Sequence, residues 1–386
     1  HLEPDQRYGY AYLQATRDAI AELDASTSRR IVLVGHDAHP HGAQTLLLYM
    51  ARMLVKDLGF RVDLVLLGDG PLLADYEAVA QVHRLHGNRD IEEEGGRLAE
   101  LLYADGIRSA ITNTTVTGHF AAILKQAGFT VVSLIHELPG IIEQYQLQSH
   151  VAAIADNVDH VVFAAQHVMD GFKTFSSLPE RRGVVRPQGL YKKNSIRSAD
   201  QLDRVRRELR EGFGLPDDAL IVLGVGYADL RKGIDLFVEA GIEVIREVPE
   251  ACFIWVGNFD PGLRREVEDT IRKSGLSGHF IFPGYDVDTD QYYAGADIYA
   301  LTSREDPYPS VVMEAMDAGL PVVAFERAGG FSELLSRGCG LLVPAFHTAE
   351  YAEAVVSLLR DADKAGEAGQ LGREIVETDF SFRRYL

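Results

Sequence analysis

Short apolar runs rich in β-branched residues alternate along this chain with longer amphipathic stretches, and this alternation constrains the fold more than any other feature. A continuous apolar run of about four to eight residues is typical of a buried strand, and a longer amphipathic stretch is typical of a helix. Strands that alternate with helices predict a parallel sheet with helices on both faces. The sequence therefore predicts an α/β protein.

The alternation occurs in two series. Predicted strands of the first series are Ile31–Val34, Val62–Leu67, Ala110–Thr112, Val131–Ile135 and Val161–Ala164, and its helices include Gln44–Leu58 and His119–Gln126. Predicted strands of the second series are Ile221–Val225, Cys252–Val256, His279–Phe282, Ile298–Leu301, Pro321–Phe325 and Gly340–Val343, with helices at Asp235–Glu247, Arg264–Ser274, Ser310–Ala318 and Ala349–Arg360. Each series opens with a strand, a loop that contains glycine, and a helix.

A chain of 386 residues is long enough for two domains. We predict two Rossmann-like parallel-sheet domains that face each other across a cleft. The first spans residues 1–190 together with a C-terminal crossing helix at about 372–386, and the second spans residues 191–371. Doubly wound sheets bind ligands beyond the carboxyl ends of their strands, so we expect the functional residues in the loops that follow strands.

Charge and cysteine content exclude several classes of function. Lys and Arg total 38 and Asp and Glu total 57, which gives a net charge of −19 and argues against nucleic-acid binding and against simple electrostatic docking on acidic lipid. Two cysteines outside any CxxC pair exclude a disulfide scaffold or a structural zinc site and predict a reducing, cytoplasmic compartment. No apolar run has the length of a membrane span. The chain begins with His1 and ends early in its final segment, so we expect it to be a piece of a longer protein.

The stretch from Leu301 to Leu335 carries the most chemical information. After a predicted strand, the loop Arg304–Pro309 holds Asp306. Glu314 follows eight positions later on a helix that we expect Ser310 to cap. Both carboxylates can reach one ligand, and carboxylates bind vicinal sugar hydroxyls well.

Gly329-Gly330 comes next, between a strand and a predicted helix start. Exposed backbone N–H groups in such a turn form an anion site. Carboxylates for a sugar and amides for an anion thus follow each other along one stretch.

Asp306 and Glu314, then Gly319-Leu320-Pro321-Val322, then Gly329-Gly330 followed by Glu333, stand in the order of a known signature. This stretch resembles the retaining GT-B glycosyltransferases of the large group 1 family (family 4), although Asp306 stands where Glu is more usual. The resemblance covers about residues 30–386 and is most specific in the second half.

Other positions also resemble the family. Arg231-Lys232-Gly233 is similar to the loop in which a Lys before Gly grips the donor diphosphate, with Tyr227 where the family often has Arg. His136, after the strand Val131–Ile135, looks like the histidine near the transferred sugar. The remaining positions for which the resemblance implies donor contacts are Gly42, Gly226, Gly284, Tyr285, Pro309 and Ser310.

The resemblance implies a retaining transfer of a sugar from a nucleoside diphosphate sugar to a carbohydrate or lipid-linked acceptor in polysaccharide or glycoconjugate biosynthesis. It implies no metal and no cofactor beyond the donor: Arg231, Lys232 and the amides near Gly329-Gly330 would stabilise the leaving diphosphate. Glu314 would hold the nucleotide ribose, and Asp306 and His136 would fix the donor sugar. Two alternatives stay open, a nucleotide-sugar epimerase on the same fold and a non-catalytic sugar or nucleotide binder.

Four further patterns have competing interpretations. The run from His36 to His41 is a metal cluster, a loop that hydrogen-bonds a sugar or acceptor, or an ordinary loop without a ligand. The triplets Asp286-Val287-Asp288 and Asp288-Thr289-Asp290 resemble a metal-binding DxD, but a solvated loop is the better interpretation. The charged segment Lys192–Asp218 is either a solvated helix or a basic patch for an anionic acceptor. Tyr8, Tyr10 and Tyr12 either pack on the first domain or contact a partner or, peripherally, a membrane.

Overall fold

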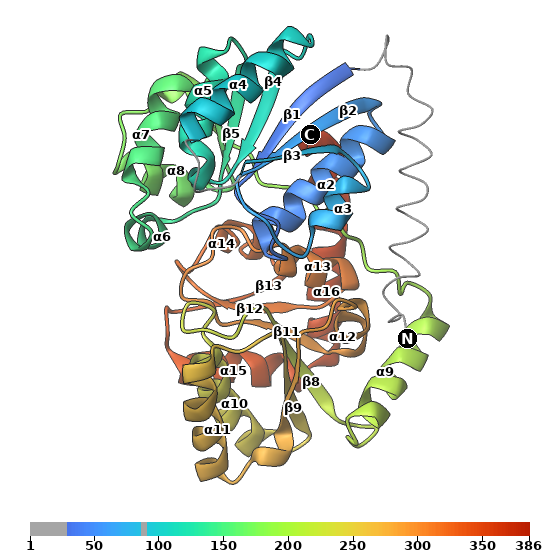
Figure 1. Cartoon of the computed structure of the whole chain (residues 1–386). Coiled ribbons are helices and arrows are strands. Elements are labelled where there is room, and N and C mark those ends of the chain that lie inside the picture. The colour runs from blue at the N-terminus through green and yellow to red at the C-terminus, as the bar shows by residue number, and fades with distance from the viewer. Residues whose placement is uncertain (1–28, 86–90) are drawn as a thin grey trace. The chain divides into compact units, whose positions relative to one another are not determined.

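The computed structural model describes residues 29–85 and 91–386 (Figure 1). Tyr8, Tyr10 and Tyr12 lie outside these residues. The described chain forms two compact units. Unit 1 contains the described residues up to Tyr191 and returns for 383–386, and unit 2 contains 192–382.

Unit 1 is built on a parallel sheet of seven strands in the order β3-β2-β1-β4-β5-β6-β7. The central pairing is set by β1, where Val32 lies opposite Asp63 of β2 and Ala110 of β4. The strands are β1 (Arg29–Gly35), β2 (Phe60–Leu66), β3 (Gln81–Arg84), β4 (Ser109–Asn113), β5 (Thr130–Ile135), β6 (His160–Phe163) and β7 (Gly183–Val185).

The helices of unit 1 lie between these parallel strands along the chain. They are α2 (Gly42–Lys56), α3 (Leu73–Glu77), α4 (Ile91–Ala104), α5 (Gly118–Gln126), α6 (Pro139–Gln144), α7 (Gln148–Asn157) and α8 (Gln166–Lys173), with short 3₁₀ turns η1 (Thr115–Thr117) and η2 (Glu180–Arg182). The C-terminal α17 (Phe382–Tyr385) ends the chain, and Arg383 of this helix donates a hydrogen bond to the carbonyl of Asp57 at 3.5 Å.

Unit 2 is built on a parallel sheet of six strands in the order β10-β9-β8-β11-β12-β13. Its strands are β8 (Leu220–Val225), β9 (Ala251–Val256), β10 (Phe280–Gly284), β11 (Ile298–Leu301), β12 (Val322–Phe325) and β13 (Gly340–Val343). Its helices are α9 (Ala199–Gly212), α10 (Ile234–Glu247), α11 (Pro261–Ser274), α12 (Asp290–Gly295), α13 (Ser310–Ala318), α14 (Ser332–Leu335), α15 (Thr348–Leu359) and α16 (Ala362–Asp379), with the 3₁₀ turn η3 (Ser277–His279). The two parallel-sheet domains predicted from the alternation are confirmed.

The predicted strands and helices appear with ends within a few residues of their expected positions, because their apolar side chains form the cores. All four residues of β12, for example, are fully buried. Two strands, β3 and β7, have no counterpart in the sequence prediction. Both are short edge strands with partly exposed residues, so neither carries the continuous apolar run by which buried strands are found.

The return to unit 1 begins at Arg383, whereas the sequence predicted it at about residue 372. Helix α16 remains in unit 2 because small residues allow it to lie close to the end of α13. A Cβ on Gly369 would stand 2.0 Å from the carbonyl oxygen of Gly319. Arg373 of α16 also donates to the carbonyls of Asp317 (3.0 Å) and Ala318 (2.7 Å), which cap the last turn of α13.

The charged segment Lys192–Asp218 contains helix α9, which begins with a capping box between Ser198 and Gln201. Several of its cations hold structure: Arg210 is buried and donates to the carbonyl of Ala219 and to Asp297 at 3.1 Å. Such pairing favours the helix interpretation over a basic patch. Among the helices that the structure describes, none combines the length and apolarity needed to cross a bilayer.

Candidate functional site

Each sheet has one place where neighbouring strands are not consecutive in sequence, β1 beside β4 in unit 1 and β8 beside β11 in unit 2. Crossovers leave such a place in opposite directions, so the loops at the carboxyl ends of the two strands part and expose backbone and side chains to a ligand. In unit 2 these loops are 226–233 after β8 and 302–309 after β11, and they contain Arg231, Lys232 and Asp306.

Lys232 and Asp306 come together at this point of unit 2. The Lys232 ammonium forms a short ion pair with Asp306 Oδ2, and Ser303 Oγ donates to the same oxygen at 3.3 Å. Both charged side chains are largely buried, with 15% and 5% exposed. An ammonium has three N–H donors, so Lys232 can bind Asp306 and an anionic ligand together.

Gly233 allows the two loops to approach this closely. Its φ is +73°, and a Cβ there would lie 2.0 Å from the carbonyl oxygen of Thr302. Both facts exclude an L side chain without a backbone shift. Glycine at 233 therefore brings the end of the β8 loop against the start of the β11 loop, which places Lys232 beside Asp306.

Arg231 extends the positive charge of this loop. Its Nη1 donates to the carbonyl of Glu305 at 3.1 Å, and its side chain stays 35% exposed. The neighbouring Arg304 forms a bidentate pair with Asp235 of α10, at 2.7 and 2.5 Å, and is therefore held away from a ligand role.

The Gly329-Gly330 turn lies directly against Asp306. Asp306 N donates to the carbonyl of Ala328 at 2.7 Å, and a Cβ on Gly329 would stand 2.0 Å from the carbonyl oxygen of Asp306. The Gly330 amide, which the sequence assigned to an anion site, donates to the carbonyl of Pro307 at 3.1 Å. In this conformation the turn therefore supports the Asp306 loop, and the Gly330 N–H is used within it.

Glu314 occupies the second turn of α13 and is partly exposed. Burial raises the pKa of its carboxyl, while the charge of Lys192 and a hydrogen bond from Tyr293 lower it. Both Asp306 and Glu314 also act on the buried phenol of Tyr299, whose pKa burial and these two charges raise far above its usual range. The two signature carboxylates thus lie in one electrostatic neighbourhood.

The remaining predicted donor contacts of unit 2 lie around these loops. Pro309, not Ser310, is the N-cap of α13, and Ser310 is its first helical residue. This corrects the expected cap: the signature proline occupies the extended position that precedes the helix. Gly226 follows β8, Gly284 ends β10, and Tyr285 is 57% exposed.

In unit 1, His136 follows β5 and its imidazole is held by Asn113 at the end of β4. Asn113 Nδ2 donates to the carbonyl of Ala43 at 2.8 Å, so Asn113 Oδ1 faces His136 Nε2 at 2.9 Å. An amide oxygen only accepts, which requires the proton on Nε2. Burial lowers the pKa of His136, against the opposing charge of Glu137, so the ring is neutral and Nδ1 carries a lone pair.

Glu137 fixes the loops after β4 and β5 to each other. Its Oε2 accepts hydrogen bonds from Thr115 N at 3.0 Å, Thr115 Oγ1 at 2.7 Å and His136 N at 3.2 Å. The preceding Thr114 has a φ of +79°, a strained value for a β-branched residue. Glu137 thus stabilises a backbone that directs the Asn113 and Thr114 side chains.

The loop from His36 to His41 forms a hydrogen-bonded cluster at the end of β1. Gln44 Nε2 donates to Asp37 Oδ1 at 2.5 Å and to His36 Nε2 at 3.0 Å. His36 Nδ1 therefore carries the proton and lies 3.1 Å from Thr114 Oγ1. Within residues 29–85 and 91–386, no three His, Cys, Asp or Glu side chains are arranged to hold a metal ion.

Gly42, the predicted glycine of this loop, is the first residue of α2, and a Cβ there would meet no atom within 4 Å. Nothing in the structure requires glycine at this position. Gln44, Asn113, Thr114 and Glu137 were not among the site residues predicted from the sequence. The sequence holds a signal for three of them: Asn113, Thr114 and Glu137 come directly after predicted strands, where polar residues interrupt the apolar pattern.

The three aspartates of the two triplets differ in exposure and in hydrogen-bond partners. Asp286 accepts a hydrogen bond from Tyr292 at 3.0 Å, and Asp288 is exposed. Asp290 is buried at the start of α12, where it accepts from Ser195 Oγ at 2.8 Å and pairs with Lys192 at 3.2 Å. The solvated-loop interpretation is therefore wrong for Asp290.

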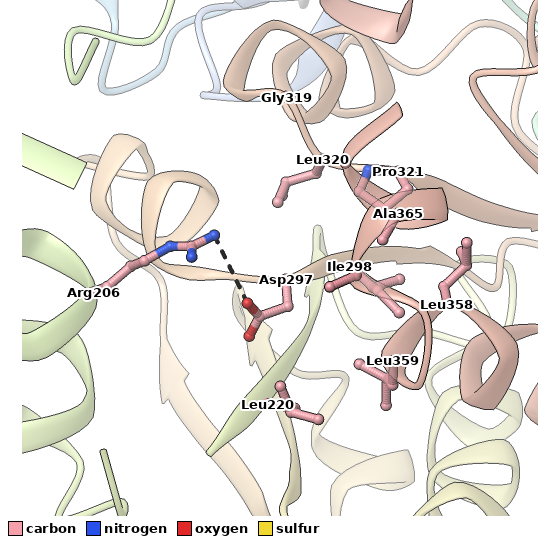
Figure 2. A pocket seen from close by; sticks show the side chains of 12 residues that line it. Arg206, Leu220, Asp297, Ile298, Gly319, Leu320, Pro321, Leu358, Leu359 and Ala365 are labelled. Carbon is pink, nitrogen blue, oxygen red and sulfur yellow. Dashed lines mark ion pairs between the residues drawn. The ribbon is translucent and has the colours of Figure 1, made fainter. Parts of the chain in front are cut away.

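A separate hollow of about 220 Å³ lies at the amino ends of the strands in unit 2 (Figure 2). It is lined by Leu220 of β8, Ile298 of β11 and Pro321 before β12, and the ion pair of Arg206 with Asp297 at 3.7 Å borders it. Since Lys232 and Asp306 follow the carboxyl ends of the same strands, this hollow is not part of the candidate site.

Known proteins resemble this chain in sequence and in fold. Residues 219–361 match the family described as glycosyl transferases group 1. The alpha-D-kanosaminyltransferase of Streptomyces kanamyceticus is 30% identical over 206 residues, which cover 53% of this chain and 52% of that protein. This chain thus spans about half the length of that relative. Spore coat protein SA of Bacillus subtilis (strain 168) is 26% identical over 331 residues, 81% of this chain and 85% of that protein.

Among solved structures, Anabaena Alr3699/HepE, crystallised in complex with UDP and glucose, matches with a TM-score of 0.79. The identity is 21%, and the match covers 92% of this chain and 96% of HepE. Residues 219–361 are therefore similar to the glycosyl transferases group 1 family, and the two parallel-sheet units of the chain have the GT-B fold that the sequence predicted.

Proposed function

We propose that this protein is a retaining glycosyltransferase that transfers a sugar from a nucleoside diphosphate sugar to a carbohydrate or lipid-linked acceptor in polysaccharide or glycoconjugate biosynthesis. The observation that carries the proposal is the Lys232–Asp306 pair where the β8 and β11 loops part. The family match and the UDP and glucose bound to HepE support it. We place the activity in the cytoplasm, where the buried, unpaired Cys252 and Cys339 stay reduced.

The donor diphosphate would bind to the loop after β8. As the bond from the sugar C1 to the β-phosphate oxygen breaks, negative charge grows on the departing nucleoside diphosphate. Lys232, oriented by Asp306, and Arg231 on the same loop would stabilise that charge. A cation that is already fixed by a buried partner needs no reorganisation during the reaction. Lys232 and Arg231 would therefore supply the positive charge that stabilises the departing diphosphate, and this step would need no metal ion.

Glu314 would accept hydrogen bonds from the ribose hydroxyls of the nucleotide. The carboxylate is the suitable group because it accepts only, and a ribose diol presents two donors. Asp306 and His136 would hold the transferred sugar. His136 offers the Nδ1 lone pair, so a sugar hydroxyl must donate to it.

The transfer step proceeds on the face that the leaving group vacates. The acceptor oxygen forms the new bond to C1 on that face, which retains the anomeric configuration. The proton of the acceptor hydroxyl passes to an oxygen of the departing phosphate. The products are the glycoside and the protonated nucleoside diphosphate, so no further acid or base is consumed.

The test is turnover of UDP-, GDP- and ADP-sugars with a panel of sugar and lipid-linked acceptors. We expect Lys232→Met and Glu314→Gln to lower turnover, the first by about 10²–10³-fold, the usual effect of removing one stabiliser of the developing anion. The exposed neighbour Lys193→Met is the matched control and should retain wild-type rates.

Wild-type rates in both site variants would contradict the proposal. Conversion of the donor in the absence of any acceptor would instead identify an epimerase. Nucleotide binding without turnover across the whole panel would identify a non-catalytic binder.

A further inference from the structure

The loop after β1 holds one carboxylate, Asp37, at the place where the sheet of unit 1 exposes its loops to a ligand. Asp37 Oδ1 accepts hydrogen bonds from Gln44 Nε2 at 2.5 Å and from His39 N at 3.0 Å. No residue that the structure describes donates to the other oxygen, Oδ2: His36 Nε2 lies 3.5 Å from it but carries no proton. The side chain is 28% exposed, so a partly exposed carboxylate keeps an unused acceptor oxygen.

A chain of hydrogen bonds from the loop after β4 sets the orientation of this carboxylate. Gln44 Nε2 donates to Asp37 Oδ1 and also to His36 Nε2 at 3.0 Å. The proton of His36 is therefore on Nδ1, which donates to Thr114 Oγ1 at 3.1 Å. Gln44 and Thr114 are both buried. Thr114 and Asp37 are thus joined through two side chains, each with a defined hydrogen-bond direction.

Thr114 has a backbone conformation that glycine would adopt far more readily. Its φ is +79° and its ψ is 153°, a region that residues with a side chain almost never occupy. Backbone contacts keep it there: its N–H donates to the carbonyl of Leu134 at 2.9 Å, and its carbonyl accepts from Thr117 N at 3.2 Å and Thr117 Oγ1 at 2.8 Å. What threonine adds over glycine is the hydroxyl that binds His36. The strained residue is therefore also the anchor of the chain that orients Asp37.

The loop after β2 fixes the backbone next to Asp37. Ala38 N donates to the carbonyl of Asp69 at 3.3 Å, and Leu72 N donates to the carbonyl of Ala38 at 2.8 Å. Gly70 lies so close that a Cβ there would stand 2.3 Å from the carbonyl carbon of Ala38. The backbone and the carboxylate of Asp37 are thus both fixed by the protein itself, which precise binding of a ligand requires.

The position of Asp37 in the sheet indicates which sugar it would meet. His136, which would hold the transferred sugar, follows β5, and β4 lies between β5 and β1. Neighbouring strands are about 4.8 Å apart, so the ends of β1 and β5 are about 10 Å apart. That separation suits two neighbouring rings, the transferred sugar at β5 and the acceptor at β1. A carboxylate only accepts, and the loop 36–41 contains no Lys or Arg, so a neutral hydroxyl suits this position better than a phosphate.

We propose that Asp37 binds a hydroxyl group of a neutral acceptor sugar through Oδ2. Gln44, His36 and Thr114 are the positioning residues that orient it. The inference rests on the proposed glycosyltransferase function and extends it to the residues of the acceptor side. The contact orients the acceptor and takes no proton from it, because that proton passes to the departing phosphate.

The experiment is initial-rate kinetics with donor and acceptor varied separately, using the UDP-, GDP- or ADP-sugar and the acceptor that the wild type turns over fastest. Asp37→Asn keeps an oxygen for Gln44 Nε2 and His39 N, and it changes the outward atom from an acceptor to an N–H donor. We expect the KM for the acceptor to rise about tenfold, the effect of losing one hydrogen bond to a charged group. The KM for the donor should not change.

The positioning chain is tested at Thr114. Thr114→Ala should raise the acceptor KM, and Thr114→Ser, which keeps the hydroxyl, should restore it. Thr114→Gly relieves the backbone but lacks the hydroxyl, so it should melt at a higher temperature than Thr114→Ala and still show the raised KM. A structural role alone would make the KM follow the melting temperature. Asp57→Asn, an exposed residue at the far end of α2, makes the same charge change and is the matched control.

An unchanged acceptor KM in Asp37→Asn, an equal rise in both KM values, or a rise in the donor KM alone would overturn the inference while the transferase activity stands. Faster turnover of a phosphorylated acceptor than of its neutral form would contradict the acceptor class. A KM that follows the melting temperature across the Thr114 variants would remove the positioning chain. If the wild type turns over no donor and acceptor of the panel, the proposed function falls, and this inference falls with it.

Discussion

Asn113 decides which nitrogen of His136 carries the proton, and the consequence can be measured. Nitrogen-15 NMR of histidine-labelled protein should show His136 as the neutral Nε2–H tautomer at pH 7, with a pKa below the ordinary 6.5 because burial disfavours the charged ring. Donor turnover should fall as pH drops through that lowered pKa, since an imidazolium cannot accept from a sugar hydroxyl. A protonated Nδ1 at pH 7 would contradict this assignment.

The contributions of Lys232 and Asp306 to the free energy of unfolding should also be coupled. Lys232→Met leaves the buried Asp306 carboxylate without its cation, and we expect the free energy of unfolding to drop by about 3 kcal/mol. The double variant with Asp306→Asn removes both charges and should recover most of that loss. Urea unfolding of the two single variants and the double variant measures the coupling, and additive effects would refute it.

The junction of the β8 loop with the β11 loop depends on glycine at 233. Gly233→Ala places a Cβ where the Thr302 carbonyl lies, at a φ of +73°, so we expect a loss of at least about 2 kcal/mol in stability together with loss of nucleotide binding. Gly96→Ala is the control: it lies inside α4, a Cβ there meets no atom within 4 Å, and it should stabilise by about 1 kcal/mol. Thermal unfolding compares them, and a stable Gly233→Ala that binds nucleotide would disprove the packing argument.

Three neighbouring strands of unit 1 share a buried carboxylate. Asp63 of β2 accepts from Arg30 of β1 at 2.9 Å and from His83 of β3 at 3.0 Å. Burial raises the pKa of Asp63, but these bonds outweigh it and the pKa lies below the ordinary 3.8. The folded pKa is depressed, so this stabilisation is present above about pH 4 and is lost as pH falls through the folded value.

Urea unfolding between pH 3 and 7 tests this contribution. The wild type should lose stability steeply in the acid range, and Asp63→Asn should show a smaller slope there. Identical slopes in the two proteins would mean that Asp63 does not contribute to the acid sensitivity.

Elements with continuous apolar runs could be predicted from the sequence, because burial on both faces of a parallel strand leaves an unambiguous pattern. The edge strand Gln81–Arg84 could not be predicted, because all four of its residues are partly or fully exposed and three of them are polar. The Lys232–Asp306 site was indicated by motif order, but the partners of His136 and Glu314 were not. Those contacts join residues distant in sequence, and only the folded loops bring them together.

Across the molecule, the two units carry different side chains at equivalent positions of their sheets, where β1 neighbours β4 in unit 1 and β8 neighbours β11 in unit 2. Unit 1 has a hydrogen-bonded network in which His36 and His136 each have a fixed tautomer. Unit 2 has cations paired with buried carboxylates, so a chain of net charge −19 still presents Lys232 and Arg231 to an anion. A nucleotide should therefore bind to unit 2, and a sugar hydroxyl should meet unit 1.

Hydrogen exchange measured by mass spectrometry, with and without UDP, GDP and ADP in turn, tests the central claim most directly. At least one nucleotide should slow exchange in residues 226–233 and 302–314, and Lys232→Met should abolish that protection. If no nucleotide protects these segments, or if protection appears only around the hollow beside Arg206 and Pro321, the donor does not bind where we place it.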